Sequence, residues 1–540
     1  MEENCRCYPY EETGYFSTIV TDYVRETATI RPFYEHSVDH DGFAAAIRQR
    51  EQFPTDRKTL VTALEKQYAQ ASLQGVSQVE ENIKSLLSPD TFTICTAHQP
   101  NIFTGYLYFV YKVLHAVKLA EQLKKDFPGK HFVPVYYMGS EDADLDELGK
   151  VFLNGEKLVW DTKQTGAVGR MKTTGIEKLL NRISGELSVL PYGPELMSML
   201  TTAYVGAPDI QTATFRLLHQ LFAGYGLVVL IADEASLKNT MQQVFHDDLF
   251  EQLPSSLVTA TNDRLAAHYK VQAHPREINL FYLEGNIRNR IVRNGDEFHV
   301  IDTAIRFSSA EMETLLKEHP ERLSPNVILR GLYQETILPN IAFIGGGGEL
   351  AYWLQLRDLF QHYKVPYPVQ VLRNSFLLIN SRSQALMQKL EIDEGEIFKP
   401  EQQLLNELVK RDTAVQIHLT NEIRDANAFY AHVSGISGKV DQSLVPHVEA
   451  LQKRMIQQLA NLEKKLLRAE KRKFSDQSRQ LHQLKDMLFP RENLQERVEN
   501  FMPFYARYGH KFIDHIYENS LTTEMKFIVC GLPVSVQLSN

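Results

Sequence analysis

The chain has 540 residues, 43% of them hydrophobic and 23% charged, a composition that excludes disordered, fibrous and membrane-spanning classes. Its formal net charge of −9 argues against nucleic acid as a partner, because neutralising phosphates needs a basic surface. The longest apolar run, 226–232, has the length of a strand and is far shorter than the ~20 residues of a membrane-spanning helix. We therefore expect a globular protein with neither nucleic acid nor membrane as a partner.

The N-terminus and the cysteines bear on where the protein works. Residues 1–10 contain acids, two cysteines and a proline where a signal peptide would have a basic start and an apolar core, which predicts a cytoplasmic protein. Four cysteines are too few for a disulfide framework, and none has zinc-ligand spacing: Cys5, Cys7, Cys95 and Cys530. Cys5 and Cys7 are too close for an unstrained bond with each other, so we expect structural or incidental cysteines and no metal site.

Helix and strand patterns alternate in the first third of the chain. Apolar residues recur at helical spacing from about 22 to 88. A β-rich run at 92–96 precedes a turn-prone stretch, a helical period at 106–125 and a second β-rich run at 132–138. Strand, helix and strand in this order predict a βαβ unit, and hence a parallel sheet that binds ligands at the carboxyl ends of its strands.

The alternation continues through the middle of the chain, with helical patterns at 215–225 and 349–362. Further strands are expected at 227–232, 341–344, 369–372 and 376–379. Polar strands and turns, including a hairpin turn at Asn294-Gly295-Asp296, lie between these elements. We expect a Rossmann-like α/β core over 1–385, with insertions at about 151–204 and 257–323.

The last third is almost free of glycine and rich in Leu, Glu, Lys, Arg and Gln. Apolar residues step by three or four, as in a coiled-coil seam: Val448, Leu451, Met455, Leu459, Leu462, Leu466 and Ala469, and later Leu481, Leu484 and Leu488. We expect an α-helical coiled-coil domain over 386–500, which pairs either with a helix at 401–427 or with another subunit. Residues 501–540 are expected to form a helix and a strand, 527–530, that return to the core.

Polar side chains follow the first predicted strand in the stretch 96–105. A loop rich in hydrogen-bonding groups before a helix is suited to a polar or anionic ligand, and His98 is a candidate general base or phosphate contact. The candidate binding residues here are Thr96, Gln99, Asn101, Thr104 and Gly105. The alternative is that Thr96 and Asn101 only cap the turn and the helix.

Five carboxylates in seven residues, 141–147, follow the second predicted strand. Converging carboxylates need a cation or an amine substrate, and their pKa values can be raised to suit acid or base chemistry. Mg²⁺ is one such cation, because it needs only one or two protein carboxylates plus substrate phosphate. Glu141 and Asp142 are the catalytic candidates, with Ser140 and Asp144 as binding residues; the alternative is a solvated acidic helix start.

A third cluster surrounds four consecutive glycines that follow the strand at 341–344. Their backbone N–H groups can approach a ligand closely, although the run matches neither a redox-dinucleotide fingerprint nor a P-loop, so no redox cofactor is expected. The candidate binding residues are Asn326, Arg330, Gln334, Glu335, Gly345, Gly346, Gly347, Gly348, Glu349, Tyr352 and Trp353.

Four segments together resemble the BshC family, the cysteine-adding enzymes of bacillithiol biosynthesis: TAHQPNIFTGYLY (96–108), GSEDADLDE (139–147), SPNVILRGLYQETILPNIAFIGGGGELAYWLQL (324–356) and NLEKKLLRAEKRK (461–473). The resemblance implies a Rossmann-like core similar to class I aminoacyl-tRNA synthetases and nucleotidylyl transferases, with connecting-peptide insertions and a coiled coil that supports a homodimer. It also implies a ligase that joins L-cysteine to the amine of glucosaminyl-malate, with ATP or another nucleotide, ADP included, as a ligand.

The resemblance assigns roles as hypotheses. Glu141 or Asp142 would orient or deprotonate the amine, while Arg330, His98 and the glycine amides would bind malate carboxylates or nucleotide phosphates. The chain lacks the second histidine of the superfamily's HxGH motif, and Arg373-Asn374-Ser375 stands where a lysine loop is expected. Two alternatives are a nucleotide-binding regulatory or assembly protein and a coiled-coil scaffold.

Overall fold

The computed structural model describes residues 5–73, 76–413 and 418–533, which form two compact units. The first unit combines the chain up to Leu378 with the segment from Asn493 onward, and the second runs from Ile379 to Glu492. These limits differ by a few residues from the expected coiled-coil domain over 386–500. No helix among the described residues is both long and apolar enough to cross a membrane.

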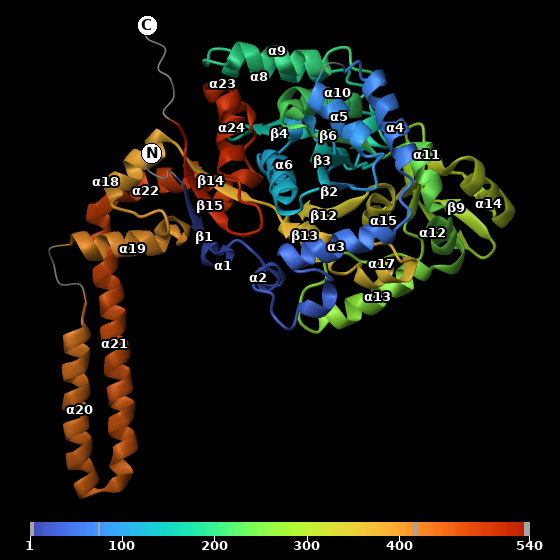
Figure 1. Ribbon diagram of the computed structural model, residues 1–540. Helices are drawn as coiled ribbons and strands as arrows, with labels where there is room; N and C mark the ends of the chain where they lie inside the picture. Colours follow the sequence, from blue (N-terminus) through green and yellow to red (C-terminus); the bar gives the residue numbers. More distant parts are fainter. Residues whose placement is uncertain (1–4, 74–75, 414–417, 534–540) are drawn as a thin grey trace. The chain divides into compact units, whose positions relative to one another are not determined.

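The first unit is built on a parallel five-stranded sheet with strand order β13-β12-β2-β3-β6 (Figure 1). Its strands are β2 (Thr91–His98), β3 (His131–Met138), β6 (Val228–Ile231), β12 (Asn340–Gly345) and β13 (Val369–Leu372). Nearly all their residues are buried, which is why the sequence shows short continuous apolar runs rather than alternation. The predicted βαβ unit and parallel sheet are confirmed.

Helices cover this sheet, and two of them share one hydrophobic cluster with it. Phe43 and Ile47 of α3 (His40–Gln52) and Leu119 and Leu123 of α6 (Tyr108–Asp126) pack with Phe92 of β2. Other helices of this unit are α2 (Thr18–Val24), α4 (Arg57–Gln70), α5 (Ser77–Ser85), α10 (Ile210–Phe222), α15 (Val327–Ile337), α16 (Gly347–Trp353) and α17 (Arg357–Tyr363). The helical pattern at 349–362 is therefore divided between α16 and α17.

Two groups of elements interrupt the sheet strands in sequence. The first contains a hairpin and two helices: β4 (Lys150–Leu153), β5 (Glu156–Val159), α8 (Ile176–Leu187) and α9 (Gly193–Tyr204). The second contains α13 (Leu253–Ala266), α14 (Ser309–Glu318) and an antiparallel sheet of β10 (Arg306–Ser308), β9 (Glu297–Val300), β8 (Ile287–Asn294), β7 (Leu280–Glu284) and β11 (Leu323–Pro325). Asn294 pairs with Glu297, so the predicted hairpin turn is confirmed, and Gly295 has φ +64°.

The two ends of the chain meet in a third sheet of order β1-β15-β14. Strand β1 (Cys5–Tyr8) pairs antiparallel with β15 (Phe527–Gly531), which follows α23 (Met502–Tyr508) and α24 (His510–Glu518). The predicted strand at 376–379 is β14 (Ser375–Ile379) of this sheet and does not join the parallel one. Cys5 and Cys530 form a disulfide, so their role is the structural one of the two expected, and the pairing itself was not predicted because 525 residues separate the two cysteines.

The second unit is helical, and its long hairpin is prominent in Figure 1. Its helices are α18 (Ser381–Leu390), α19 (Glu401–Asp412), α20 (Thr420–Val440), α21 (Val445–Lys471) and α22 (Ser475–Leu488). The expected single helix over 401–427 is wrong, since α19 ends at Asp412 and α20 starts at Thr420; part of that range, 414–417, lies outside the described residues.

Within the hairpin, α21 packs on α20, but not through the whole predicted seam. Leu451, Met455 and Leu462 remain 37 to 46% exposed, whereas Ile456 and Leu466 are partly buried. Leu466, like the partly buried Leu459 and the buried Val448, belongs to the predicted seam, so one part of that seam is covered and another part is exposed. Leu481, Leu484 and Leu488 of α22 are fully buried, so they pack within the helical unit.

Candidate active site

A cavity of about 390 Å³ lies at the carboxyl ends of the parallel strands. Its lining includes residues that follow β2, β3, β12 and β13, the place where parallel α/β sheets bind ligands. Eleven of the predicted site residues line it: His98, Gln99, Glu141, Asp142, Asn326, Arg330, Gly346, Gly347, Gly348, Glu349 and Tyr352. Three segments that are far apart in the sequence therefore meet at one site.

Three glycines, Gly346, Gly347 and Gly348, form one wall of this cavity, and two positions of the run are tightly packed. A Cβ at Gly345 would lie 2.9 Å from the Phe343 ring, and one at Gly347 would lie 3.1 Å from Val20 Cγ2. None of the four glycines has a positive φ, and a Cβ at Gly348 would have no atom within 4 Å, so close packing accounts for Gly345 and Gly347 but not for the whole run. Gly345 itself ends strand β12 and does not line the cavity.

Glu349 is fixed at the start of α16 by two donors. Its Oε2 accepts hydrogen bonds from Gly346 N at 2.9 Å and from the buried Lys112 Nζ at 2.5 Å. Burial disfavours the carboxylate, but the charge and hydrogen bond of Lys112 outweigh it and lower the pKa of Glu349. Burial also lowers the pKa of Lys112, whose Nζ donates a second bond to Ala97 O. Glu349 is thus an ionised, immobile part of the wall.

His98 is neutral in this environment. Burial, followed by the nearby charge of Lys112, lowers the pKa of His98 to about 3. Its Nε2 lies 3.4 Å from the hydroxyl of Tyr108. A histidine with so low a pKa is a weak base and carries no charge at neutral pH, so it is suited to hydrogen bonding with a ligand rather than to ion pairing.

Four arginines make a cationic side of the cavity: Arg288, Arg330, Arg373 and Arg497. Arg373 has a salt bridge, in which Nη2 lies 2.7 Å from Glu496 Oε1, and Arg330 donates to the hydroxyl of Tyr352. Arg288 and Arg497 form no salt bridge with a described residue, and burial lowers the pKa of both. Charge that is buried and incompletely paired favours binding of an anion such as a carboxylate or phosphate.

Opposite charge is provided by Glu141 and Asp142. Glu141 is bonded to Lys238, a fully buried lysine whose Nζ also lies 3.3 Å from Asp233. Burial raises the pKa of Glu141, and the charge of Lys238 opposes this shift. Asp142 Oδ2 accepts from Gln99 Nε2 at 3.1 Å, and its Oδ1 accepts from Ala143 N at 2.7 Å. Asp142 is therefore oriented by neutral donors, whereas Glu141 is neutralised by a lysine.

The acidic run does not converge on a metal site. Asp144 caps helix α7 (Leu145–Leu148) by accepting from Glu147 N at 3.0 Å, and it does not line the cavity. Of the two carboxylates that do line it, Glu141 already holds Lys238 and both oxygens of Asp142 accept hydrogen bonds. The residues present do not fit an Mg²⁺ ion held directly by the protein.

Ten predicted site residues lie outside the cavity lining, and some of them make buried contacts elsewhere. Glu335 makes a buried ion pair of 2.9 Å with Arg50, and burial raises its pKa to about 7. Thr96 Oγ1 donates to Ile344 O at 2.9 Å. The full set is Thr96, Asn101, Thr104, Gly105, Ser140, Asp144, Gln334, Glu335, Gly345 and Trp353.

The end of β2 and the loop after it are divided between residues that line the cavity, His98 and Gln99, and residues that are enclosed beside it. Phe103, Thr104 and Gly105 have φ between +51° and +67°, and Asn101 and Thr104 are buried. Asn500 Nδ2 donates to the carbonyl oxygens of Phe103 and Gly105, which ties the loop to the C-terminal segment. Asn101 Oδ1 and Thr104 Oγ1 are buried and have no hydrogen-bond partner among the described residues, and neither residue lines the cavity.

Sequence reasoning missed several cavity residues as binding groups, notably Arg288, Arg373, Arg497, Tyr108 and Tyr137. Arg373 directly follows β13, so the rule that ligands bind at strand ends points to it. Arg288 lies on β8 of the second insertion and Arg497 near the C-terminus, and no sequence pattern links either to the sheet.

Family models match both units. Residues 3–374 match the model described as "Bacillithiol biosynthesis BshC, N-terminal Rossmann-like domain", and residues 376–532 match "Bacillithiol biosynthesis BshC, C-terminal coiled-coil domain".

Two relatives named as candidate cysteine ligases BshC are similar over nearly the whole chain. The protein from Flavobacterium psychrophilum is 37% identical over 94% of this chain and 96% of its own length. The protein from Christiangramia forsetii is 35% identical over 98% of this chain and all of its own length.

Among solved structures, a candidate arginyl-tRNA synthetase from Campylobacter jejuni covers 82% of this chain and 98% of its own, with 10% identity and a TM-score of 0.21. The two family models, in order along one chain, and relatives above 30% identity over almost its full length show that this protein belongs to the BshC family of bacillithiol biosynthesis.

Proposed function

We propose that the protein is a carbon–nitrogen ligase that joins L-cysteine to the amine of glucosaminyl-malate, forming bacillithiol in the last step of its synthesis. The observation that carries the proposal is the cavity, which four arginines and three carboxylates line at the strand ends of a BshC-family chain. The relatives' names as cysteine ligases support the same reaction.

Charge distribution fits the substrates of such a reaction. Glucosaminyl-malate has two carboxylates and an amine, and a cavity with arginines as well as acids can hold both kinds of group. We assign the carboxylates or nucleotide phosphates to Arg288, Arg330 and Arg497, together with the N–H groups at Gly347 and Gly348. The amine then belongs beside Asp142.

Asp142 is a better partner for the amine than Glu141. An amine must lose its proton to attack an acyl group, and a carboxylate within hydrogen-bond reach accepts that proton or orients the nitrogen. Glu141 is already paired with the buried Lys238, whereas Asp142 is held only by a side-chain amide and backbone N–H groups. Neutral His98 is placed to hydrogen-bond a polar substrate group without adding charge.

Joining a free carboxylate to an amine requires activation, and we propose ATP or a related nucleotide as the energy donor. The arginines and the glycine wall suit phosphate groups, although the chain lacks the second histidine and the lysine loop of the related superfamily. If the activation is an adenylation, the enzyme catalyses cysteine-dependent exchange of pyrophosphate into ATP. Product formation without this exchange would overturn adenylation.

One incubation tests the reaction and the energy donor together. The purified protein is mixed with L-cysteine, glucosaminyl-malate and ATP, and mass spectrometry follows the thiol product, AMP and ADP. The proposal predicts product that depends on all three substrates, with one nucleotide consumed per amide. Absence of product with well-folded protein, or product at the same rate without ATP, would contradict it.

We also propose a homodimer formed through the α20–α21 hairpin. Besides Leu451, Met455 and Leu462 of α21, three large apolar residues of α20 are 52 to 79% exposed: Phe429, Ile436 and Val440. Two helices with this much exposed apolar surface are typical of an interface, and a second copy of the hairpin offers a matching surface.

A further inference from the structure

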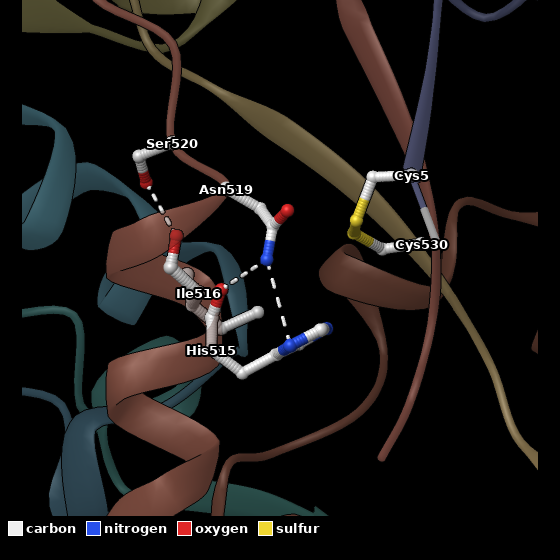
Figure 2. Close-up of a disulfide and its surroundings, with 6 residues drawn as sticks. All are labelled: Cys5, His515, Ile516, Asn519, Ser520 and Cys530. Atoms are coloured by element: carbon white, nitrogen blue, oxygen red, sulfur yellow. Dashed lines mark hydrogen bonds between the residues drawn. A yellow bond between two sulfur atoms is a disulfide. The ribbon is translucent and has the colours of Figure 1, made fainter. Parts of the chain in front are cut away.

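A second group of reactive side chains lies outside the cavity, where the first and last strands of the chain meet. It consists of Cys5 of β1, Cys530 of β15 and His515 of α24 (Figure 2). One ligand atom from each lies within 4.8 Å of the other two. None of these residues lines the active-site cavity, so the group has no part in the proposed reaction.

The fold brings these residues together through strand register. Cys5 is directly opposite Cys530 in the antiparallel β1–β15 pair, and residues opposite each other project from the same face of a sheet. His515 lies in the last turn of α24, and its side chain faces the sulfurs in Figure 2. Eight residues separate the end of α24 from the start of β15. Asn519 Nδ2 donates to His515 O at 2.8 Å and lies 3.5 Å from its Nδ1.

The donor atoms have the composition of a zinc site. Two cysteine thiolates and one imidazole are soft and borderline ligands, and three protein ligands with a water in the fourth position are a known zinc arrangement. With Zn–S bonds of about 2.3 Å, tetrahedral geometry places two sulfurs about 3.8 Å apart, so the two sulfurs that are bonded here must separate before zinc binds. The buried Nε2 of His515 makes no hydrogen bond of normal geometry with the described residues.

Two of the three residues in this group are partly exposed. Cys5 and His515 are partly exposed, whereas Cys530 is fully buried. A metal ion can therefore enter past two of its ligands, and a small reductant or oxidant can reach the sulfur of Cys5. Within this cluster of described residues, the sulfur of Cys5 and the imidazole of His515 are the ligand groups that lie beside the buried Cys530.

We propose that Cys5, Cys530 and His515 bind one Zn²⁺ ion when the disulfide is reduced, and that zinc and the disulfide are alternative links between β1 and β15. A small thiol, two molecules per bond, reduces the disulfide and is itself oxidised to its disulfide, leaving two cysteine thiols that lose their protons to bind zinc. In the reverse direction a hydroperoxide oxidises the two thiolates, taking two electrons from them and two protons from water. The S–S bond forms, and the hydroperoxide is reduced to an alcohol and water. The zinc ion is released because its two sulfur ligands are now bonded to each other.

A covalent or zinc-mediated link between β1 and β15 matters because β1 leads into residues that support the active-site wall. Tyr10, two residues after β1, donates its hydroxyl hydrogen to Arg373 O at 3.0 Å, and Val20 of α2 packs against Gly347. Both links would hold the first strand in place, so that the support of Arg373 and of the glycine wall survives a change of redox state.

Zinc titration of the full chain tests the proposal. The protein is reduced with a phosphine, stripped with a chelator and titrated with Zn²⁺ in competition with a chromogenic chelator. We expect one zinc ion per chain, with affinity lowered at least about 100-fold in Cys5→Ser, Cys530→Ser and His515→Ala. Cys7→Ser is the matched control, because Cys7 is on the same strand but outside the cluster, and it should bind zinc as the unsubstituted chain does.

Two further measurements make the result independent of folding defects. Cobalt substituted for zinc should give a thiolate charge-transfer band that Cys7→Ser retains and Cys5→Ser loses. Peroxide should release one equivalent of zinc as the Cys5–Cys530 bond forms, detected by mass spectrometry of unreduced peptides. The proposal is overturned if reduced, folded protein binds no more zinc than the Cys5→Ser/Cys530→Ser variant, or if Cys7→Ser loses zinc equally.

Discussion

The two units of this protein are opposites in what they bury. The sheet unit buries charges, among them Arg50, Lys112 and Lys238, whereas the hairpin of the helical unit exposes large apolar side chains such as Phe429 and Val440. Buried charge and exposed apolar surface both cost stability, so each marks a place where binding, rather than folding alone, explains the residue. The comparison supports the proposal of chemistry in one unit and of association through the other.

The largest expected effect is on catalysis at Asp142. Asp142→Asn keeps the hydrogen-bonding shape but removes the charge that holds the amine, so the rate of product formation should fall at least about 100-fold. Steady-state assay with mass detection of the thiol measures it. Asp144→Asn is the control, because asparagine also caps a helix and Asp144 lies outside the cavity; equal loss in both variants would contradict the assignment.

Glu335 should behave as a structural residue even though it belongs to the same sequence cluster as the cavity wall. Glu335→Gln leaves Arg50 buried without its counter-charge and should lower the free energy of unfolding by about 3 kcal/mol. Urea unfolding measures the change. The folded fraction should keep its specific activity, and a selective loss of activity with unchanged stability would move Glu335 into the binding site.

Arg288 tests whether the second insertion contributes to substrate binding. Arg288→Gln removes a cation that has no salt bridge with a described residue, so KM for the anionic substrate should rise about 10- to 100-fold with little change in stability. Arg290→Gln, on the same strand but exposed, is the matched control. An unchanged KM for Arg288→Gln would remove this arginine from the site.

The hairpin should lose association without losing helix content. Leu451→Lys or Leu462→Lys places a charge on exposed apolar surface, and each should weaken the proposed dimer by about 10-fold or more. Sedimentation over a concentration series measures this, with circular dichroism as the folding check. Arg454→Ala, an exposed polar position on the same helix, should have little effect; a monomeric unsubstituted chain would contradict the interface.

The smallest effect concerns pH. The pKa of His98 is about 3 when folded against 6.5 when unfolded, so the unfolded chain binds the extra proton between these values. The free energy of unfolding should therefore decrease as pH falls through this window and be unaffected by His98 above it. His98→Asn should show a shallower loss of stability between pH of about 7 and about 5 in urea titrations. An identical slope in both proteins would mean that His98 titrates normally.

Prediction from the sequence succeeded where the signal was local. The short apolar runs that became β2, β3 and β12 and the hairpin turn at Gly295 follow from side-chain periodicity and turn chemistry. The sequence did not distinguish residues that line the cavity from residues that lie outside it, because Thr104 and Glu335 are as polar as Asp142. Only packing separates a polar group that supports a buried turn or an ion pair from one that faces a cavity.

The sequence by itself determined the alternating α/β core, the helical region after it and the resemblance to the BshC family, since these depend on patterns within tens of residues. The tertiary structure alone decided that Arg288 and Arg497 join Asp142 at one cavity and that Cys5 meets Cys530. The physical reason is that sheet register and strand order bring distant residues together, and no local periodicity records them.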